Sequence, residues 1–271
     1  MRPGTTKPIE PGVITFLRSA YNGNGTSSLL IVAKRRYGLL ARVLAVHALG
    51  ALALLALART VHAVFDLGPW YLAKMAALYA LGTVLCVAFV EGHHPFPRYG
   101  PANLVTLIRG LLVALIAGLI GEAPMPGPAL FAALLAATIA FLDGLDGRLA
   151  RTSGMSSSFG ARFDMETDSV LVLAMSILAW QHGKAGPWIL GIGLMRYAFA
   201  AAGKALPWLA GPLTPTMRGK TVAVVQMGVL SFALAPFVPI PLSTAAAAIA
   251  LAMLVWSFAI DVGRLWRQRS G

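Results

Sequence analysis

From residue 39 to residue 263 the chain alternates between apolar runs of about twenty residues and short polar connections. A helix of that length can cross a hydrocarbon core of about 30 Å. The pattern therefore predicts an all-α fold, a polytopic integral membrane protein with eight membrane helices. Their approximate ranges are 39–63, 71–91, 103–121, 127–150, 160–181, 186–206, 220–238 and 243–263.

Basic residues collect at alternate connections, which predicts the orientation of the chain. The connections 121–128 and 236–242 contain no Lys or Arg, and 182–187 contains only Lys184. The positive-inside bias places these three outside and the basic connections in the cytoplasm. We expect both termini in the cytoplasm and a bacterial inner membrane as the location. Residues 1–37 lack a signal-peptide pattern and are interpreted as a cytoplasmic extension.

The composition agrees with a membrane protein, since 58% of residues are hydrophobic and only 12% are charged. A net charge of +12 would indicate nucleic-acid binding in a soluble chain. Here the Lys and Arg residues lie at helix ends, so membrane orientation explains them and no nucleic-acid partner is expected. The single cysteine, Cys86, excludes a disulfide within the chain and a Cys-based zinc site.

Half of the ten acidic residues lie between positions 143 and 168. A carboxylate at membrane depth costs about 3 kcal/mol unless it faces a cavity, a partner or an ion. Asp143 and Asp146 are three residues apart, and Asp164 and Asp168 are four apart, so each pair lies on one face of its helix. Two helices can thus present four carboxylates to each other, and these would repel if ionised.

A divalent cation relieves this repulsion, and oxygen-only ligands favour Mg²⁺ or Mn²⁺. A pair of such ions is suited to binding a diphosphate. We therefore predict a metal site for two ions, with Asp143, Asp146, Asp164 and Asp168 as ligands. The alternative is that these carboxylates cap helix ends and form salt bridges with nearby arginines.

Small residues share the faces of these carboxylates: Gly147, Ala150 and Gly160. They let a ligand approach the helix backbone, although close helix packing would use them equally well. With Arg151 they complete the spacing Asp-x2-Asp-Gly-x2-Ala-Arg-x8-Gly-x3-Asp-x3-Asp. This resembles the signature of the CDP-alcohol phosphotransferase (CDP-alcohol phosphatidyltransferase) family at every fixed position. The resemblance covers about residues 97–265.

The resemblance implies a six-helix catalytic core within residues 97–271, preceded by two additional transmembrane helices in residues 38–96. It also implies a transferase of substituted phosphate groups in phospholipid biosynthesis. In this reaction a hydroxyl of a small alcohol acceptor attacks the β-phosphorus of a CDP-linked lipid donor, for which we expect CDP-diacylglycerol, and CMP is released. Members of the family are membrane enzymes and usually homodimers.

The resemblance also assigns roles to residues. The four aspartates would hold the metal ions, and Asp168 would also act as general base for the acceptor hydroxyl. The CDP pocket would be lined by Gly147, Ala150, Arg151 and Gly160.

Upstream, Asn103, Thr106 and Arg109 resemble a Pro-Asn-x-x-Thr-x-x-Arg element of the family, with one extra residue after Pro101. They fall three apart on one helix face, from which they could reach the nucleotide or a metal-bound phosphate. Alternatively, Asn103 or Thr106 caps the helix and Arg109 extends to the membrane interface.

We expect an anionic acceptor, such as glycerol 3-phosphate or inositol phosphate, because arginines in apolar spans require anions. The residues concerned are Arg162, Arg196, Arg218 and Lys220. Extension to the interface or an ion pair with Glu166 would explain them as well. The Ser-rich stretch before Gly160 resembles choline and ethanolamine phosphotransferases, so an aminoalcohol or serine acceptor stays open.

Two functions of other classes also place carboxylates in a membrane. A Mg²⁺-dependent prenyltransferase would release pyrophosphate, and an ion-coupled transporter would consume no nucleotide. Neither accounts for the complete Gly, Ala and Arg pattern.

Overall fold

The computed structural model describes residues 25–211 and 216–269, apart from the side chains of residues 25–36, 145, 146, 148, 150 and 151. In this part of the chain there are eight α-helices, two short 3-10 helices and no strand, which confirms the all-α prediction. The α-helices are α2 (Gly25–Phe65), α3 (Tyr71–His93), α4 (Pro101–Gly118), α5 (Pro126–Thr152), α6 (Ser158–Gln181), α7 (Leu190–Ala205), α8 (Met217–Leu234) and α9 (Ile240–Arg269). The 3-10 helices are η2 (Pro187–Ile189) and η3 (Pro207–Ala210).

Five of the described helices are long and apolar enough to cross a membrane. They are α2 from Tyr37, α3, α4, α5 as far as Gly144, and α9. Helices α6, α7 and α8 were also predicted to span the membrane but do not meet this criterion, and each for an identifiable reason. The first turns of α6 carry four charged residues, α7 has only 16 residues, and α8 begins beside Arg218 and Lys220.

The first helix begins at Gly25, well before its predicted start at residue 39. Residues 26–37 contain neither proline nor glycine, so nothing in this stretch interrupts a helix. Part of the predicted extension is therefore helical, whereas residues 1–24 lie outside the described residues. The last helix likewise continues past its predicted end at residue 263 to Arg269, where basic residues complement the helix dipole.

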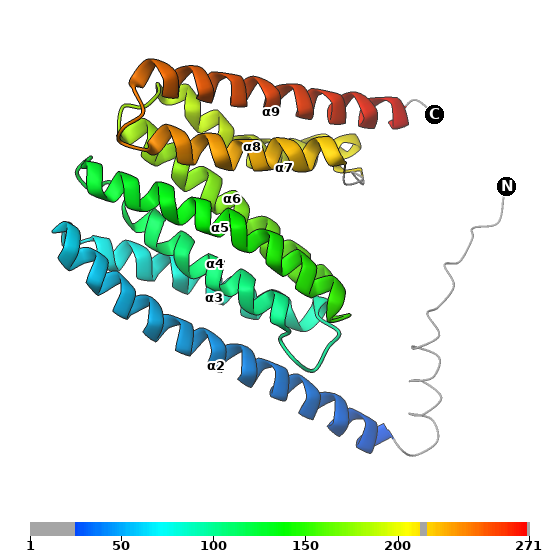
Figure 1. Ribbon diagram of the computed structural model, residues 1–271. Coiled ribbons are helices and arrows are strands. Elements are labelled where there is room, and N and C mark those ends of the chain that lie inside the picture. The colour runs from blue at the N-terminus through cyan, green and yellow to red at the C-terminus, as the bar shows by residue number, and fades with distance from the viewer. Residues whose placement is uncertain (1–24, 212–215, 270–271) are drawn as a thin grey trace.

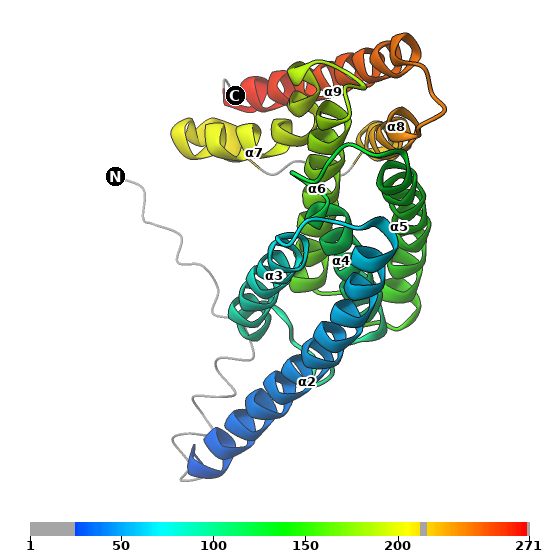
Figure 2. The same cartoon turned by 90° about the vertical axis from the view of Figure 1, so that its left-hand side faces the viewer.

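The helices form two groups that α6 connects. Figure 1 shows α2 to α5 in one group and α7 to α9 in the other, and Figure 2 shows α6 crossing between them. The most buried membrane helix is α4, with 56% of its apolar stretch inside the protein against 17% in α3 and in α9. It packs against α3, α5 and α6, and this places it at the centre of the first group.

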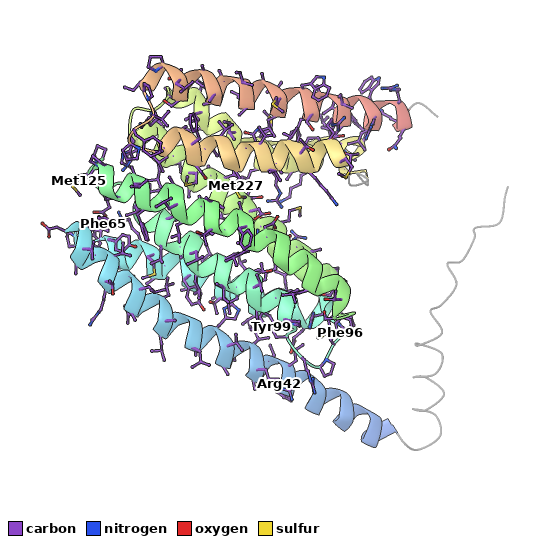
Figure 3. All side chains as sticks on the ribbon, in the orientation of Figure 1. Arg42, Phe65, Phe96, Tyr99, Met125 and Met227 are labelled. Carbon is purple, nitrogen blue, oxygen red and sulfur yellow. The ribbon has the colours of Figure 1, made fainter. Side chains whose placement is uncertain are left out.

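The long helix α2 is attached to its group near its middle and near its end. Near its middle, Arg42 donates a hydrogen bond from Nη1 to the carbonyl oxygen of Pro97 at 2.9 Å (Figure 3). Near its end, the rings of Phe65 and Phe131 have their centroids 5.7 Å apart. Helix α3 packs on α4 and α6, so both helices before the predicted core contact the core directly.

Buried charges fix the connections on the side predicted to lie outside. Glu122 accepts hydrogen bonds from the Gly68 backbone N–H and from Lys74 Nζ, both at 2.6 Å. Burial alone would raise the pKa of Glu122, but the hydrogen bonds from Lys74 and Gly68 lower it below its usual value. Lys184 donates to the carbonyl oxygens of Ala235 and Val238 at 2.9 and 2.8 Å, and burial lowers the pKa of its ammonium group.

A glycine allows α7 to approach α6 closely. A Cβ atom at Gly193 would lie only 2.6 Å from the Cα atom of Leu173. A larger residue would push the two backbones apart. This contact brings Arg196 of α7 within hydrogen-bonding distance of Glu166 on α6.

Candidate active site

Three helices bring the predicted site together at similar depth. Arg109 lies at the middle of α4, eight residues after its first residue; Asp143 lies nine residues before the end of α5; and Asp164 and Asp168 lie six and ten residues after the beginning of α6. At a rise of 1.5 Å per residue, each lies roughly 9–15 Å from its helix end. Because α4 and α5 are antiparallel, these ends lie on the same side of the protein (Figure 1).

Arg109 is at the centre of the acidic cluster. Its side chain is completely buried, and its guanidinium contacts Oδ1 of Asp143 at 2.9 Å and Oδ1 of Asp164 at 2.5 Å. It also pairs with Oδ1 of Asp168. The three carboxylates are 41%, 36% and 32% exposed, so they form the open side of the cluster. The alternative that Arg109 extends to the membrane interface is therefore wrong.

The cluster fits a divalent cation. Asp143, Asp164 and Asp168 each offer a carboxylate oxygen, and these oxygens lie within 4.8 Å of one another. Oxygen donors are the ligands that hard cations prefer. Among the described side chains, one guanidinium pairs with these three carboxylates, and a cation would balance the negative charge that this pairing leaves. The side chain of Asp146, the fourth predicted ligand, lies outside the described residues.

Asn103 and Thr106 share the buried face of α4 with Arg109, as their spacing indicates. Their exposed fractions are 4% and 2%. Asn103 donates from Nδ2 to the Tyr99 carbonyl oxygen at 2.5 Å. The N-cap position of α4 is Gly100, so neither Asn103 nor Thr106 caps this helix.

The signature glycine of α6 permits close contact with α4. Ser157 caps α6 by accepting a hydrogen bond from the Gly160 N–H at 3.1 Å, and its hydroxyl is also hydrogen-bonded to His94. A Cβ atom at Gly160 would lie 2.7 Å from Oδ1 of Asn103. Two of the predicted CDP-binding residues are thus neighbours. Gly147 lies on α5, and the side chains of Ala150 and Arg151 are outside the described residues.

Two of the predicted acceptor residues already have anionic partners. Arg196 donates two hydrogen bonds to Glu166, at 2.8 and 3.0 Å, and a third to Ser169 at 2.6 Å. Arg218 pairs with Asp261. The ion-pair alternative therefore describes Arg196, and the acceptor role of both arginines stays a prediction.

The other two predicted acceptor residues lie apart from these pairs. The guanidinium of Arg162 is 5.3 Å from the centroid of the Phe89 ring on α3. On α6, Arg162 lies two residues from Asp164, so it projects from the opposite side of the helix. Lys220 is exposed at the beginning of α8. Their acceptor role also stays a prediction.

The pairing of Arg109 with the carboxylates themselves was not predicted. Its spacing placed it on the correct face of α4, but from there it was expected to reach the nucleotide or a metal-bound phosphate. The available signal was an arginine within an apolar helix, since such a residue requires an anionic partner inside the protein.

These features define an integral membrane protein with a carboxylate site suited to a divalent cation. The family model of CDP-alcohol phosphatidyltransferase matches residues 100–257, more than half of the chain, and the protein belongs to this family. It is therefore a membrane transferase of substituted phosphate groups, which transfers phosphatidyl groups in phospholipid biosynthesis. Neither a curated protein nor a solved structure matches the chain.

Proposed function

We propose that the enzyme transfers a phosphatidyl group from CDP-diacylglycerol to a hydroxyl of a small alcohol and releases CMP. The cluster of Asp143, Asp164 and Asp168 around Arg109 carries this proposal, because it lies within the residues that match the family. The three carboxylates lie roughly 9–15 Å from helix ends on one side of the protein, the side from which the headgroup of a membrane-embedded donor would approach them.

In the proposed reaction the acceptor oxygen forms a bond to the β-phosphorus, and the bond between that phosphorus and the CMP oxygen breaks. The proton of the acceptor hydroxyl passes to the carboxylate of Asp168. Arg109 keeps Asp164 and Asp168 in place for this role. Two Mg²⁺ or Mn²⁺ ions held by the aspartates would neutralise the diphosphate and stabilise CMP as a leaving group.

We assign CDP binding to residues next to the cluster. Asn103 and Gly160 are in contact, and Thr106 is buried one turn after Asn103 on the same face. The full set consists of Asn103, Thr106, Gly147, Ala150, Arg151 and Gly160.

We further propose an anionic acceptor. The described ends of α7, α8 and α9 carry six basic residues and one carboxylate, Asp261. Such a surface attracts anions to this end of the protein. The basic residues are Lys204, Arg218, Lys220, Arg264, Arg267 and Arg269.

The location and assembly follow from the same proposal. The carboxylates lie at the end of the bundle where the basic connections gather, which by the positive-inside bias faces the cytoplasm of a bacterial inner membrane. We expect the enzyme to act there as a homodimer.

The decisive experiment measures CMP release by the purified enzyme with CDP-diacylglycerol and Mg²⁺ or Mn²⁺. The acceptors compared are glycerol 3-phosphate, inositol phosphate, inositol, serine and choline. We expect CMP release that depends on a phosphorylated acceptor. Release with serine or choline alone would contradict the anionic acceptor, and binding of CDP without release for any acceptor would contradict the donor. Release of pyrophosphate from a prenyl donor would contradict the reaction.

Replacing the proposed base tests the role of Asp168. Asp168→Asn keeps the size of the side chain but removes a proton acceptor and a ligand, so we expect at least about a hundredfold loss of turnover. CMP release is the measurement. Asp66→Asn is the matched control, because Asp66 has a φ of 47°, which asparagine tolerates. Activity of Asp168→Asn close to that of the control would refute the assignment.

A further inference from the structure

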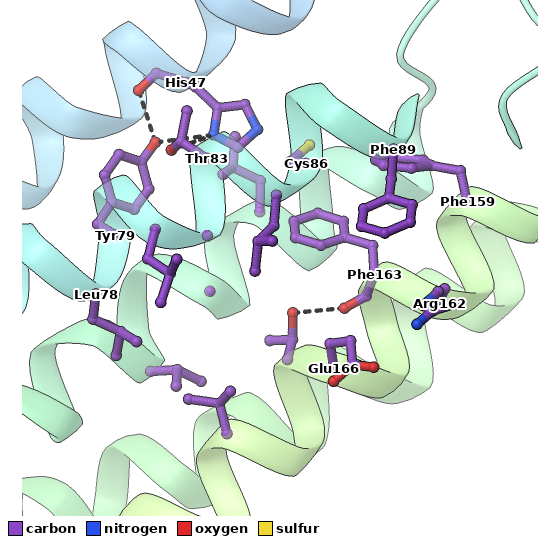
Figure 4. Close-up of a pocket in the computed structure, with 18 of the residues that line it drawn as sticks. His47, Leu78, Tyr79, Thr83, Cys86, Phe89, Phe159, Arg162, Phe163 and Glu166 are labelled. Atoms are coloured by element: carbon purple, nitrogen blue, oxygen red, sulfur yellow. Dashed lines mark hydrogen bonds between the residues drawn. The ribbon is translucent and has the colours of Figure 1, made fainter. Parts of the chain in front are cut away.

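A cavity of about 430 Å³ lies between α3, α4 and α6 (Figure 4). This volume is within the range of small-molecule sites, about 300–1,000 Å³. Each wall is one face of a helix, because the lining residues recur every three or four positions. On α3 they include Gly82, Cys86, Phe89 and His93; on α4, Leu107, Gly110 and Ala114; on α6, Phe159, Phe163, Glu166 and Val170.

The cavity is long and almost entirely apolar. Along α3 it extends from Leu78 to His93, which corresponds to roughly 22 Å at the rise of an α-helix. One half of a bilayer core is about 15 Å thick. The polar lining residues include His47, Tyr79 and Thr83 towards one end, His93, Ser158 and Arg162 at the other, and Glu166 and Thr167 between them; the rest of the lining is mostly apolar. A cavity of this shape fits a hydrocarbon chain better than a compact polar ligand.

The deeper end is closed by polar groups that satisfy one another. His47 Nδ1 is 3.0 Å from the Thr83 hydroxyl, and the Tyr79 hydroxyl donates to the His47 carbonyl oxygen at 2.7 Å (Figure 4). These groups complete a hydrogen-bonded wall. A ligand's headgroup would therefore lie at the opposite end of the cavity, beside the end of α3 and the beginning of α6.

That end has a positive charge available. Arg162 lines it and forms no salt bridge with a carboxylate of the described residues, although Glu166, one turn away on α6, is close enough to interact with it electrostatically. Glu166 lines the cavity too, but its carboxylate is bound on both oxygens by Arg196. The guanidinium of Arg162 over the Phe89 ring is therefore placed to bind an anion.

The cavity is separate from the acidic cluster. Arg162, Glu166 and Val170 lie on one side of α6, whereas Asp164 and Asp168 project from the other side and pair with Arg109. One wall of the cavity is α3, which precedes the residues matched by the family model. The cavity therefore lies where the additional helix α3 packs against α4 and α6 of the matched region.

We propose that this cavity binds a membrane phospholipid with an anionic headgroup, with one acyl chain between α3 and α6 and the phosphate at Arg162. The lipid is a bound component of the fold and not the CDP-linked donor. The inference does not depend on which alcohol the enzyme uses.

Native mass spectrometry of the delipidated protein tests the proposal. The probes are phosphatidylglycerol and phosphatidylcholine with the same palmitoyl and oleoyl chains, each with and without CDP. We expect one phosphatidylglycerol per chain, bound about tenfold more tightly than phosphatidylcholine and not displaced by CDP. Equal affinity for both lipids, or displacement by CDP, would overturn the proposal.

Two substitutions locate the lipid. Gly82 lines the cavity, and a Cβ atom there meets nothing within 4 Å. Gly82→Phe adds an aromatic ring to this wall, and we expect at least about a tenfold loss of lipid affinity. The control is Gly228→Phe, an equally open position on α8 outside the cavity, which should bind as the wild type does. Arg162→Gln should remove the preference for phosphatidylglycerol. If Gly82→Phe bound the lipid as tightly as the wild type, the proposed lipid site would be refuted. This holds whatever the oligomeric state of the variant.

A measurement without any substitution uses Cys86, the single cysteine, which lines the cavity. Bound lipid should shield its thiol from N-ethylmaleimide. We expect phosphatidylglycerol to slow labelling about fivefold or more relative to phosphatidylcholine at the same concentration. Equal labelling rates would contradict the proposal even if the substituted proteins failed to fold.

Discussion

At the scale of single residues, the acidic cluster depends on Arg109. Its guanidinium is completely buried and contacts Asp143, Asp164 and Asp168, which come from two other helices. Arg109 forms salt bridges with all three carboxylates, so in the absence of a cation it compensates much of their charge. A metal ion bound by the same oxygens would also neutralise their negative charge. The stability of the protein should therefore couple Arg109 to metal.

We predict that Arg109→Gln destabilises the metal-free protein by about 3–5 kcal/mol, because three neighbouring carboxylates lose their buried partner. Saturating Mg²⁺ or Mn²⁺ should recover much of this loss. The measurement is thermal unfolding in EDTA and in each metal. Lys74→Gln, which breaks the pair with Glu122 on the other side of the protein, should show the same deficit in all conditions. If the loss of stability in Arg109→Gln were the same in EDTA and in metal, this would argue against a metal site.

At the scale of elements, connections as well as helices hold the bundle. Glu122, in the connection between α4 and α5, joins the beginning of α3 to the α2–α3 connection through Lys74 and Gly68. Its pKa in the folded protein is lowered, despite burial, by these hydrogen bonds. A carboxyl group with a lowered pKa stabilises the fold above its unfolded pKa, and this contribution disappears as pH falls through the folded value.

We therefore predict that the melting temperature falls as pH is reduced below about 4.5, the ordinary range of a glutamate. Glu122→Gln should cost about 2 kcal/mol at neutral pH and should show a smaller loss between neutral and acidic pH. Thermal unfolding in detergent at pH 7, 5 and 4 provides the comparison. If the melting temperatures of the wild type and Glu122→Gln depended on pH in the same way, Glu122 would not contribute to the pH dependence of stability.

The sequence predicted the positions of the helices better than the contacts between them. The apolar runs located all eight described helices, because apolar stretches of this length form helices in a membrane, but only five of the eight are long and apolar enough to cross one. Carboxylate spacing correctly placed Asp143 beside Asp164 and Asp168. The partner of Arg109 and the cavity were not predicted. Both depend on how separate helices pack, and the cavity residues have the ordinary apolar spacing of any buried helix face.

At the scale of the whole molecule, the membrane orientation can be measured. In a Cys86→Ala background, Ala123→Cys reports the α4–α5 connection and Ser153→Cys reports the α5–α6 connection, and both positions are exposed. We predict that a membrane-impermeant maleimide labels Ala123→Cys in intact cells and Ser153→Cys only after permeabilisation. The reverse pattern would place the carboxylates outside the cytoplasm.

The pairing of Arg109 also has a consequence for the synthesis of the protein. Arg109 leaves the ribosome before its partners, since Asp164 and Asp168 follow it by 55 and 59 residues. An arginine at the middle of a span costs about 2.5–3.5 kcal/mol during insertion. Until α6 is made, α4 therefore carries a charge that two of its three carboxylates cannot yet balance. Helix α4 must stay beside the insertion machinery, or in contact with α5, until α6 arrives to complete the cluster.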